Sequence, residues 1–270
     1  MIDTTEGWLL GGRIRYAQPR TGFRTGIEPV LIAAAVPAVA GQRALEAGTG
    51  AGAGLLCLVS RIRGIEGLGV EREPGLAALA NANLGANGVS RIRVVEADVT
   101  RLPPNPTFDH AFANPPWHPA SGTAALDPAR VRATRGADLG RWITALAAAL
   151  RRGGTLTFIL PAASMARAML AAEQASCGNI TLFPLWPKQG RAAKLVLLQA
   201  VRAGRASPRL LAGLTLHRED GRFTTAAEAV LREGSALDLG NGTSRALGAP
   251  ASPAEPAASG RLVWAVPEIP

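Results

Sequence analysis

Short apolar runs alternate with longer stretches of helical periodicity along the chain from Ala44 onward. The short runs have the length of buried strands and the longer stretches have the length of helices. We expect strands near residues 44–47, 65–70, 92–96, 109–113, 155–160, 180–185 and 193–201, and helices near 52–62, 74–85, 138–151 and 163–175. Pro74 fits the first turn of a helix, and Gly153-Gly154 would end the helix before the fifth strand. This alternation predicts βαβ units, a parallel sheet and an α/β fold.

The two ends of the chain lack this alternation. Residues 1–43 contain a turn-rich stretch that enters a short Ala-rich helix, and we interpret them as a flap over the sheet edge. The end from about Asn241 is rich in Ala, Pro, Gly and Ser, so it would not bury enough surface to offset its ordering entropy. We therefore divide the chain into a lead-in (1–43), one α/β domain (44–235) and a tail (236–270) that we expect to be disordered.

Composition narrows the class of protein. The 270 residues include 29 Lys and Arg against 20 Asp and Glu, a formal net charge of +9, and only Lys188 and Lys194 of the basic residues are lysines. This excess of arginine fits a polyanionic substrate, because Arg binds phosphate as a fork and counterion release favours the complex. Genomic base bias toward Ala, Arg and Gly would produce the same excess, so charge alone does not identify the substrate.

The cysteines and the apolar segments bear on location. Cys57 and Cys177 belong to no CxxC or Cys/His cluster, so we expect a reduced cytoplasm and no metal site. The N-terminus has no basic region leading into an apolar run, and no apolar segment reaches membrane-spanning length. We therefore expect a cytoplasmic protein without a membrane partner. No Ser/His/Asp or Cys/His arrangement points to hydrolysis.

The first of four motifs is Leu45-Glu-Ala-Gly-Thr-Gly-Ala-Gly-Ala-Gly54, a strand followed by a glycine loop that opens a helix. Gly48, Gly50 and Gly52 would let the backbone turn sharply and approach a ligand. Their GxGxG spacing differs from the GxGxxG of pyrophosphate sites. A cofactor without phosphates, S-adenosylmethionine, fits better than a dinucleotide, and we include Glu46 among its binding residues. The alternative is a tight turn without a ligand.

Two further motifs end strands with an acidic residue. Gly67-Leu-Gly-Val-Glu-Arg72 brings Glu71 and Arg72 about twenty residues beyond the glycine loop, where a carboxylate can accept both ribose hydroxyls. In the next strand end, Asp98 is placed to accept from the adenine amino group while Val99 packs against the ring. Each motif is common by itself, but their order after the glycine loop favours a cofactor site.

The fourth motif, Asn114-Pro115-Pro116-Trp117, follows the fourth strand. An exocyclic amine conjugated to a ring or carbonyl is a poor nucleophile, because its lone pair is delocalised. Two acceptors that hold its N–H groups would draw the nitrogen toward tetrahedral geometry and stabilise the developing charge. The Asn114 side-chain oxygen and the Pro115 carbonyl can be those acceptors, and Trp117 can stack on a planar substrate. The alternative is a proline-rich turn with an incidental Trp.

Basic residues gather where ligands bind in open α/β sheets, although a solvated surface would account for many of them. The candidates for contacts with RNA are Arg132, Arg135, Lys188, Arg191 and Lys194. Of the three histidines, we interpret His110 as a core residue and His217 as structural, whereas His118 directly follows the fourth motif and could contact substrate.

With these motifs, the sequence resembles the bacterial tRNA adenine-N6 methyltransferases that modify the adenosine beside the anticodon of a valine tRNA. The resemblance runs from Gly12 to about Gly234, and its more specific parts are Tyr16–Leu31, Lys188–Gln199, Leu214–His217 and Phe223–Glu228. It implies a Rossmann-like, seven-stranded class I methyltransferase sheet with helices on both faces, S-adenosylmethionine as cofactor and tRNA as partner. It also implies that Arg24, Thr25 and Gly26 approach the cofactor. One departure is Trp117, where the family commonly has Tyr.

Three other functions remain open. Release-factor glutamine methyltransferases share the Asn-Pro-Pro turn but usually carry a larger N-terminal helical domain, whereas about forty residues precede the glycine loop here. Methylation of guanine N2 in ribosomal RNA would use the same chemistry. A non-catalytic RNA-binding protein on a methyltransferase scaffold would not need the intact motif that begins at Asn114.

Overall fold

The computed structural model describes residues 2–21, 24–104, 107–116 and 139–240. Four residues singled out in the sequence and the predicted tail beyond Gly240 lie outside these ranges; the four are Trp117, His118, Arg132 and Arg135. Within the described part of the chain, no helix is both long enough and apolar enough to cross a membrane.

Every predicted strand and helix of the central region is present, although Gly153-Gly154 lie inside a strand and do not end the preceding helix, which stops at Ala149. The strands are β3 (Arg43–Ala47), β4 (Glu66–Glu71), β5 (Ile92–Glu96), β6 (Phe108–Ala113), β7 (Leu150–Pro161), β8 (Cys177–Trp186) and β9 (Leu195–Arg202). The helices are α1 (Glu28–Ala35), α2 (Ala53–Arg61), α3 (Pro74–Ala86), α5 (Leu139–Ala149) and α6 (Met165–Gln174). The elements that were not predicted are β1 (Thr4–Leu9), β2 (Ile14–Pro19), β10 (Arg209–Leu210), β11 (Leu214–Thr215), α7 (Thr225–Glu233) and the short 3-10 turns η1 (Leu10–Gly12), η2 (Val99–Arg101) and η3 (Ala162–Ser164).

The seven predicted strands form one sheet, which β10 and β11 extend to nine strands in the order β10-β8-β9-β7-β6-β3-β4-β5, with β11 also on β8. The predicted α/β sheet is therefore confirmed. A fully parallel sheet is wrong for β9, which runs antiparallel to β7 and β8. The physical reason is the connection over residues 187–194, which contains no helix and is too short for a crossover between parallel strands.

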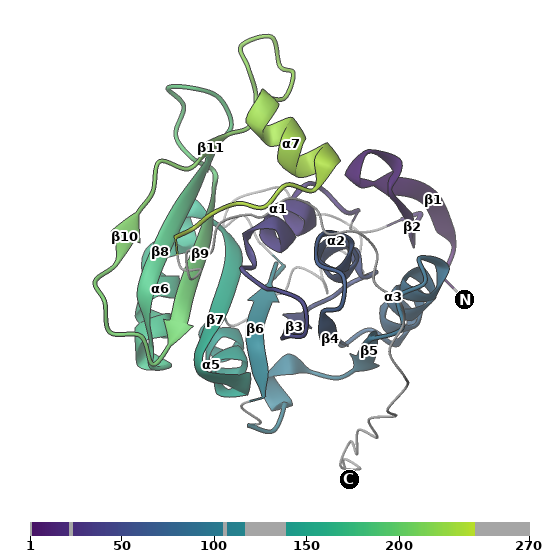
Figure 1. Cartoon of the computed structure of the whole chain (residues 1–270), viewed down its shortest axis with the longest axis horizontal. Helices are drawn as coiled ribbons and strands as arrows, with labels where there is room; N and C mark the ends of the chain where they lie inside the picture. Colours follow the sequence, from purple (N-terminus) through teal and green to yellow (C-terminus); the bar gives the residue numbers. More distant parts are fainter. Residues whose placement is uncertain (1, 22–23, 105–106, 117–138, 241–270) are drawn as a thin grey trace.

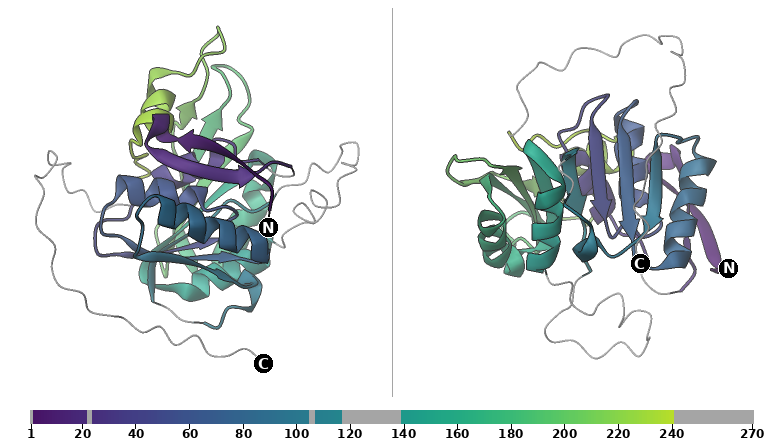
Figure 2. Two further views of the ribbon diagram at one scale, coloured as in Figure 1. Left: turned by 90° about the vertical axis from the view of Figure 1, so that its right-hand side faces the viewer. Right: turned by 90° about the horizontal axis from the view of Figure 1, so that it is seen from below.

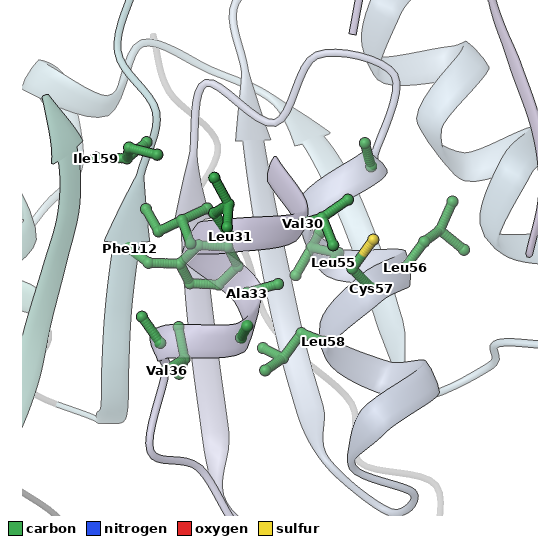
Figure 3. Packing of buried hydrophobic residues seen from close by; sticks show 14 of the residues in the cluster. Val30, Leu31, Ala33, Val36, Leu55, Leu56, Cys57, Leu58, Phe112 and Ile159 are labelled. Carbon is green, nitrogen blue, oxygen red and sulfur yellow. The ribbon is translucent and has the colours of Figure 1, made fainter. Parts of the chain in front are cut away.

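Helices cover both faces of the sheet, as predicted (Figure 1). On one face, α1, α2 and α3 enclose an apolar cluster in which Phe112 of β6 is fully buried. Figure 3 shows the Phe112 ring beside Leu31 of α1, with Leu55 of α2 nearby. The neighbours of Phe112 along β6 face the other way and pack under α5 and α6. Alternation along β6 therefore supplies both layers of the core.

The lead-in forms an antiparallel hairpin, β1–β2, as a separate two-stranded sheet. Its main contacts are with helices: β2 packs on α2 and α3, and η1 packs on α7. Figure 2 shows the hairpin running across the α3 side of the molecule, so it covers helices more than the sheet edge. At the other end, Leu239 is buried in the α1 layer and the Leu237 N–H donates to the carbonyl of Ala34. The folded unit therefore extends at least to Gly240.

Candidate active site

Three parallel strands bring the predicted motifs to one edge of the sheet. Ala47 of β3 pairs with Val70 of β4 on one side and with Ala113 of β6 on the other. The next residues along these strands are Gly48, Glu71 and Asn114, so the first, second and fourth motifs emerge side by side. This is the carboxyl edge of the sheet, where open α/β folds bind ligands.

The glycine loop is folded as the motif predicts. Gly48, Gly50 and Gly52 have φ angles of +64°, +57° and +92°, which L-residues with side chains rarely adopt. A Cβ on Gly50 would meet no atom within 4 Å, so open space lies above the centre of the loop. A Cβ on Gly48 would come within 2.7 Å of the indole of Trp142 from α5. The loop therefore fits a ligand that approaches the backbone at Gly50, and Trp142 borders the loop at Gly48.

Glu71 connects the second motif to the glycine loop. Its Oε2 accepts from the Gly50 N–H at 2.8 Å and its Oε1 accepts from the Glu73 N–H at 3.0 Å. Each carboxylate oxygen has a second lone pair, so the buried side chain can still accept ribose hydroxyls. Arg72 is different, because its exposed guanidinium lies 3.9 Å from Glu73 at the surface. Its contact with a cofactor stays a prediction.

Glu46 lies beneath the loop. It is 4% exposed, and its Oε2 accepts from the Leu55 N–H at 3.2 Å in the first turn of α2. Burial raises the pKa of Glu46 well above its usual range, and the nearby charge of Glu71 raises it further. The carboxyl therefore supports the start of α2 from inside the protein. The sequence motif alone did not distinguish this place from a direct contact with the ligand.

The third motif forms a capped turn. Asp98 is the N-cap of η2, and its Oδ1 accepts from both the backbone N–H and the hydroxyl of Thr100 at 2.9 and 2.8 Å. Partial burial would raise the pKa of Asp98, but these hydrogen bonds lower it below its ordinary value. Asp98 is thus held as an anion that accepts hydrogen bonds. Val99 is buried in the core layer under α5, so its packing against an adenine ring stays a prediction.

Asn114, which follows β6 at this edge, has a buried side-chain oxygen. Its Oδ1 is buried and has no hydrogen-bond partner among the described residues. Leaving such an acceptor unpaired costs about 1–3 kcal/mol, so proteins seldom retain one without a reason. Pro115, which follows it, is also buried. An acceptor held out of water beside the glycine loop is what a site for an amine N–H donor requires.

The β1–β2 hairpin holds the flap segment 24–26 through hydrogen bonds to Thr25. The Thr25 hydroxyl is 2.8 Å from the Tyr16 hydroxyl, and the Thr25 N–H donates to Gln18 Oε1 at 3.0 Å. Burial raises the pKa of Tyr16 to about 12; the bond with Thr25 lowers it, and the charge of nearby Glu46 raises it. This part of the flap therefore lies near the base of the glycine loop. Arg24 and Gly26 are exposed, and their approach to a cofactor stays a prediction.

The basic candidates that the structure describes lie on the β8–β9 connection. Lys188 Nζ donates to the carbonyl of Glu219, which ties this connection to the loop before α7, and Arg191 and Lys194 are exposed. His217 stacks on Phe223 beside that loop, consistent with a structural role. In the described ranges, no group of three or more His, Cys, Asp or Glu side chains could hold a metal ion.

A cavity of about 440 Å³ lies away from these motifs. It is lined by residues 176–178 and 203–206, where β8 begins and β9 ends. Because β8 runs parallel to β6 in the same sheet, this is the edge opposite the glycine loop. The cavity and the candidate active site are therefore separate.

The residues present fit S-adenosylmethionine: open space over Gly50, a buried carboxylate at Glu71, an anionic Asp98 and an unpaired acceptor at Asn114. They offer no cradle for a pyrophosphate, because the loop has the GxGxG spacing.

The chain was compared with known protein families, curated proteins and solved structures. No family model matches the chain. A release factor glutamine methyltransferase from Rhodospirillum rubrum is 35% identical over 124 residues, which is 45% of this chain but only 37% of that relative. The crystal structure of a predicted O-methyltransferase, Atu636 from Agrobacterium tumefaciens, matches with a TM-score of 0.66 and 25% identity over 78% of this chain and 98% of that one. A looser match, TM-score 0.48 and 15% identity, is geranyl diphosphate methyltransferase in complex with SAM.

The fold and these similarities agree with the class that the motifs predicted, the class I methyltransferases. The particular resemblance to the tRNA adenine-N6 family is not confirmed. The curated relative is instead a glutamine methyltransferase, which is one of the three alternatives that the sequence left open.

Proposed function

We propose that this protein transfers a methyl group from S-adenosylmethionine to a planar, conjugated –NH2 nitrogen, and that its favoured substrate is the side-chain amide of a glutamine in a protein. The observation that carries the proposal is the buried, unpaired Asn114 Oδ1 beside the glycine loop. The choice of glutamine is supported by the similarity to the release factor enzyme over 124 residues.

The chain's own groups account for the nitrogen chemistry. S-adenosylmethionine supplies an electrophilic methyl group when it is bound. Asn114 Oδ1 and the Pro115 carbonyl would each accept one N–H of the substrate, which orients the lone pair and stabilises positive charge as the new N–C bond forms. Because Oδ1 is already desolvated, this stabilisation requires little reorganisation. Glu71 would hold the cofactor by its ribose and Asp98 would hold it by its adenine amino group.

A second candidate substrate, adenine N6 in tRNA, presents the same planar –NH2 group to Asn114. It is favoured by the net charge of +9 and by the basic residues on the β8–β9 connection, Lys188, Arg191 and Lys194. Contacts from these residues to the phosphate backbone would make binding fall steeply with salt. Arg132 and Arg135 belong to the same proposal, although they lie outside the described residues.

Transfer of a labelled methyl group separates the two substrates. The protein is incubated with labelled S-adenosylmethionine and, in parallel, with purified release factor, total tRNA or ribosomal RNA, and each product is digested and analysed by mass. Methylglutamine from release factor supports the proposal. N6-methyladenosine from tRNA with no label in protein would replace it with the second candidate. Absence of transfer to all three, by protein that binds S-adenosylmethionine, would contradict both, and Asn114→Ala serves as the catalytically impaired control.

A further inference from the structure

Helix α3 and its C-cap residue carry three asparagines that bind strand backbones in the same way. Each amide accepts from the N–H of one residue and donates to the C=O of that same residue, as a neighbouring strand would. Asn81 does this with Val94 of β5, Asn83 with Ala17 of β2 and Asn87 with Arg15 of β2. These side chains therefore provide hydrogen-bond partners for backbone N–H and C=O groups on two edges, the outer edge of the main sheet at β5 and the free edge of the hairpin at β2.

The bonds to the hairpin differ in exposure, because those of Asn83 with Ala17 are partly buried whereas those of Asn87 with Arg15 are exposed. The Ala17 N–H donates to Asn83 Oδ1 at 2.9 Å, and Asn83 Nδ2 donates back to the Ala17 carbonyl at 2.8 Å. Asn87 forms the equivalent pair with Arg15 at 3.1 and 2.7 Å. Arg15 and Ala17 are two positions apart, so their backbone groups face the same side of β2, away from β1. The hairpin is thus attached to α3 through its main chain.

Asn87 is half-buried and donates its second Nδ2 hydrogen to the carbonyl of Asn83 at 2.8 Å, whereas Asn83 is buried and has a different partner. Its second Nδ2 hydrogen is donated to the carbonyl of Ala51, inside the glycine loop, at 2.8 Å. The side chain is 4% exposed, so this bond is buried. The loop and α3 are also close at the next residue, where a Cβ on Gly52 would lie 3.3 Å from Ala80. One amide therefore joins the hairpin to the loop that is expected to contact the cofactor.

The hairpin in turn binds Thr25, the middle residue of the flap segment 24–26. Ala17, which Asn83 binds, lies between Tyr16 and Gln18, and these two side chains bind the hydroxyl and the N–H of Thr25. A continuous series of hydrogen bonds therefore runs from the Ala51 carbonyl through Asn83 and β2 to Thr25. The amide of Asn83 therefore binds both the glycine loop and the strand that holds Thr25.

We propose that Asn83 is a positioning residue that sets the glycine loop and the flap in register for S-adenosylmethionine. The inference rests on the proposed cofactor site. It predicts that cofactor binding at the loop stabilises the hairpin, and that the hairpin contributes to cofactor affinity by the same factor, because coupling between two sites is reciprocal.

The test compares Asn83→Ala with Asn87→Ala. Both variants remove a bidentate contact with β2, but only the first removes the bond to the Ala51 carbonyl. We expect both to lower the melting temperature, and we expect only Asn83→Ala to weaken S-adenosylmethionine binding, by roughly tenfold in calorimetry without any methyl acceptor, as for loss of one buried hydrogen bond of about 1.5 kcal/mol. Hydrogen exchange at residues 14–19 should slow on cofactor addition in wild type and in Asn87→Ala, but not in Asn83→Ala.

The outcomes separate this inference from the proposed function. If wild type does not bind S-adenosylmethionine, the cofactor site itself is wrong. If wild type binds it and folded Asn83→Ala binds equally well, only the role of Asn83 is wrong. Should Asn83→Ala fail to fold, Tyr16→Phe gives the decision, because it keeps the buried ring and removes only the bond to Thr25. A several-fold weaker affinity in Tyr16→Phe supports the linkage, and an unchanged affinity overturns it.

Discussion

Strand β6 has buried polar groups near both of its ends, and their surroundings differ. Near its amino end, His110 Nε2 lies 2.8 Å from Gln42 Oε1, and Nδ1 lies 2.7 Å from the Thr155 hydroxyl. Gln42 Oε1 also accepts from the Val39 N–H, so it is an acceptor and His110 Nε2 is the donor. At the carboxyl end, Asn114 Oδ1 has no partner in the described part of the chain.

This difference indicates that the polar groups at the two ends of the strand have different roles. Buried polar groups whose hydrogen bonds are complete stabilise one arrangement and have no capacity left for a ligand. Asp109, beside His110, is also held by the protein, because its two oxygens accept from the Arg43 N–H and from Arg151. A buried acceptor without a partner instead costs stability and is available to a ligand. We therefore expect changes at the amino end to affect stability, and changes at the carboxyl end to affect function.

The largest expected effect is the response of stability to acid at the amino end. Burial lowers the pKa of His110 from 6.5 to about 4, and the charge of Asp109 offsets part of this. The folded state therefore binds fewer protons than the unfolded state between these two values, and stability falls as pH decreases from about 6.5 to about 4. The loss attributable to His110 is about 3 kcal/mol, at 1.36 kcal/mol for each pKa unit.

Denaturant unfolding at several pH values between 7 and 4 measures this loss. Carboxylates also titrate in acid, so His110→Gln is the control. That variant should be less stable than wild type at pH 7 but should lose less stability on acidification. Parallel pH profiles for the two proteins would show that His110 does not contribute.

At the carboxyl end, Asn114→Ala should lower the turnover of methyl transfer by about a hundredfold or more, comparable to loss of an oxyanion-hole donor. Affinity for S-adenosylmethionine should remain within a few-fold. The melting temperature should hold or rise, because the substitution removes an unpaired buried acceptor. Steady-state kinetics with calorimetry and thermal unfolding check all three, and a folded variant with near-normal turnover would disprove the amine mechanism.

Strand β4 permits the same comparison of ends with two glutamates. Glu71→Gln at its carboxyl end should weaken S-adenosylmethionine binding by about tenfold, because charge-assisted hydrogen bonds to the ribose become neutral ones. Glu66→Gln at its amino end removes only an ion pair with Arg91, 3.5 Å long, and should leave the affinity unchanged. Calorimetry on both variants is the measurement. Equal affinities in the two variants would rule out Glu71 as the ribose ligand.

The smallest effect concerns the ion pair at the amino end of the sheet. Arg151 is 50% exposed and pairs with Asp109, so Arg151→Ala should lower the free energy of unfolding by about 1 kcal/mol or less. The loss should diminish at high salt, and affinity for S-adenosylmethionine should not change. A larger, salt-independent loss would mean that Asp109 depends on this partner because it is partly buried.

What the sequence determined by itself was local. The strands and helices of the central region follow from apolar periodicity, and the GxGxG spacing alone predicted glycines at positions that the structure places at positive φ. The order of Gly50, Glu71, Asp98 and Asn114 was sufficient to predict the cofactor class. Each of these motifs is encoded within about one strand and one turn, so recognising it needs no knowledge of distant contacts.

Tertiary structure decided the remaining features, because they depend on residues far apart in the chain. Asn83 was a polar position on a predicted helix, and only packing shows that it binds Ala17 and Ala51, 66 and 32 residues away. Nothing local distinguishes Glu46, which supports α2 from inside, from Glu71, whose carboxylate lies against the Gly50 N–H. His110, whose hydrogen bonds are complete, lies in β6, and the unpaired Asn114 directly follows the same strand. Whether a buried polar atom finds a partner is settled only by what neighbouring strands and helices bring to it.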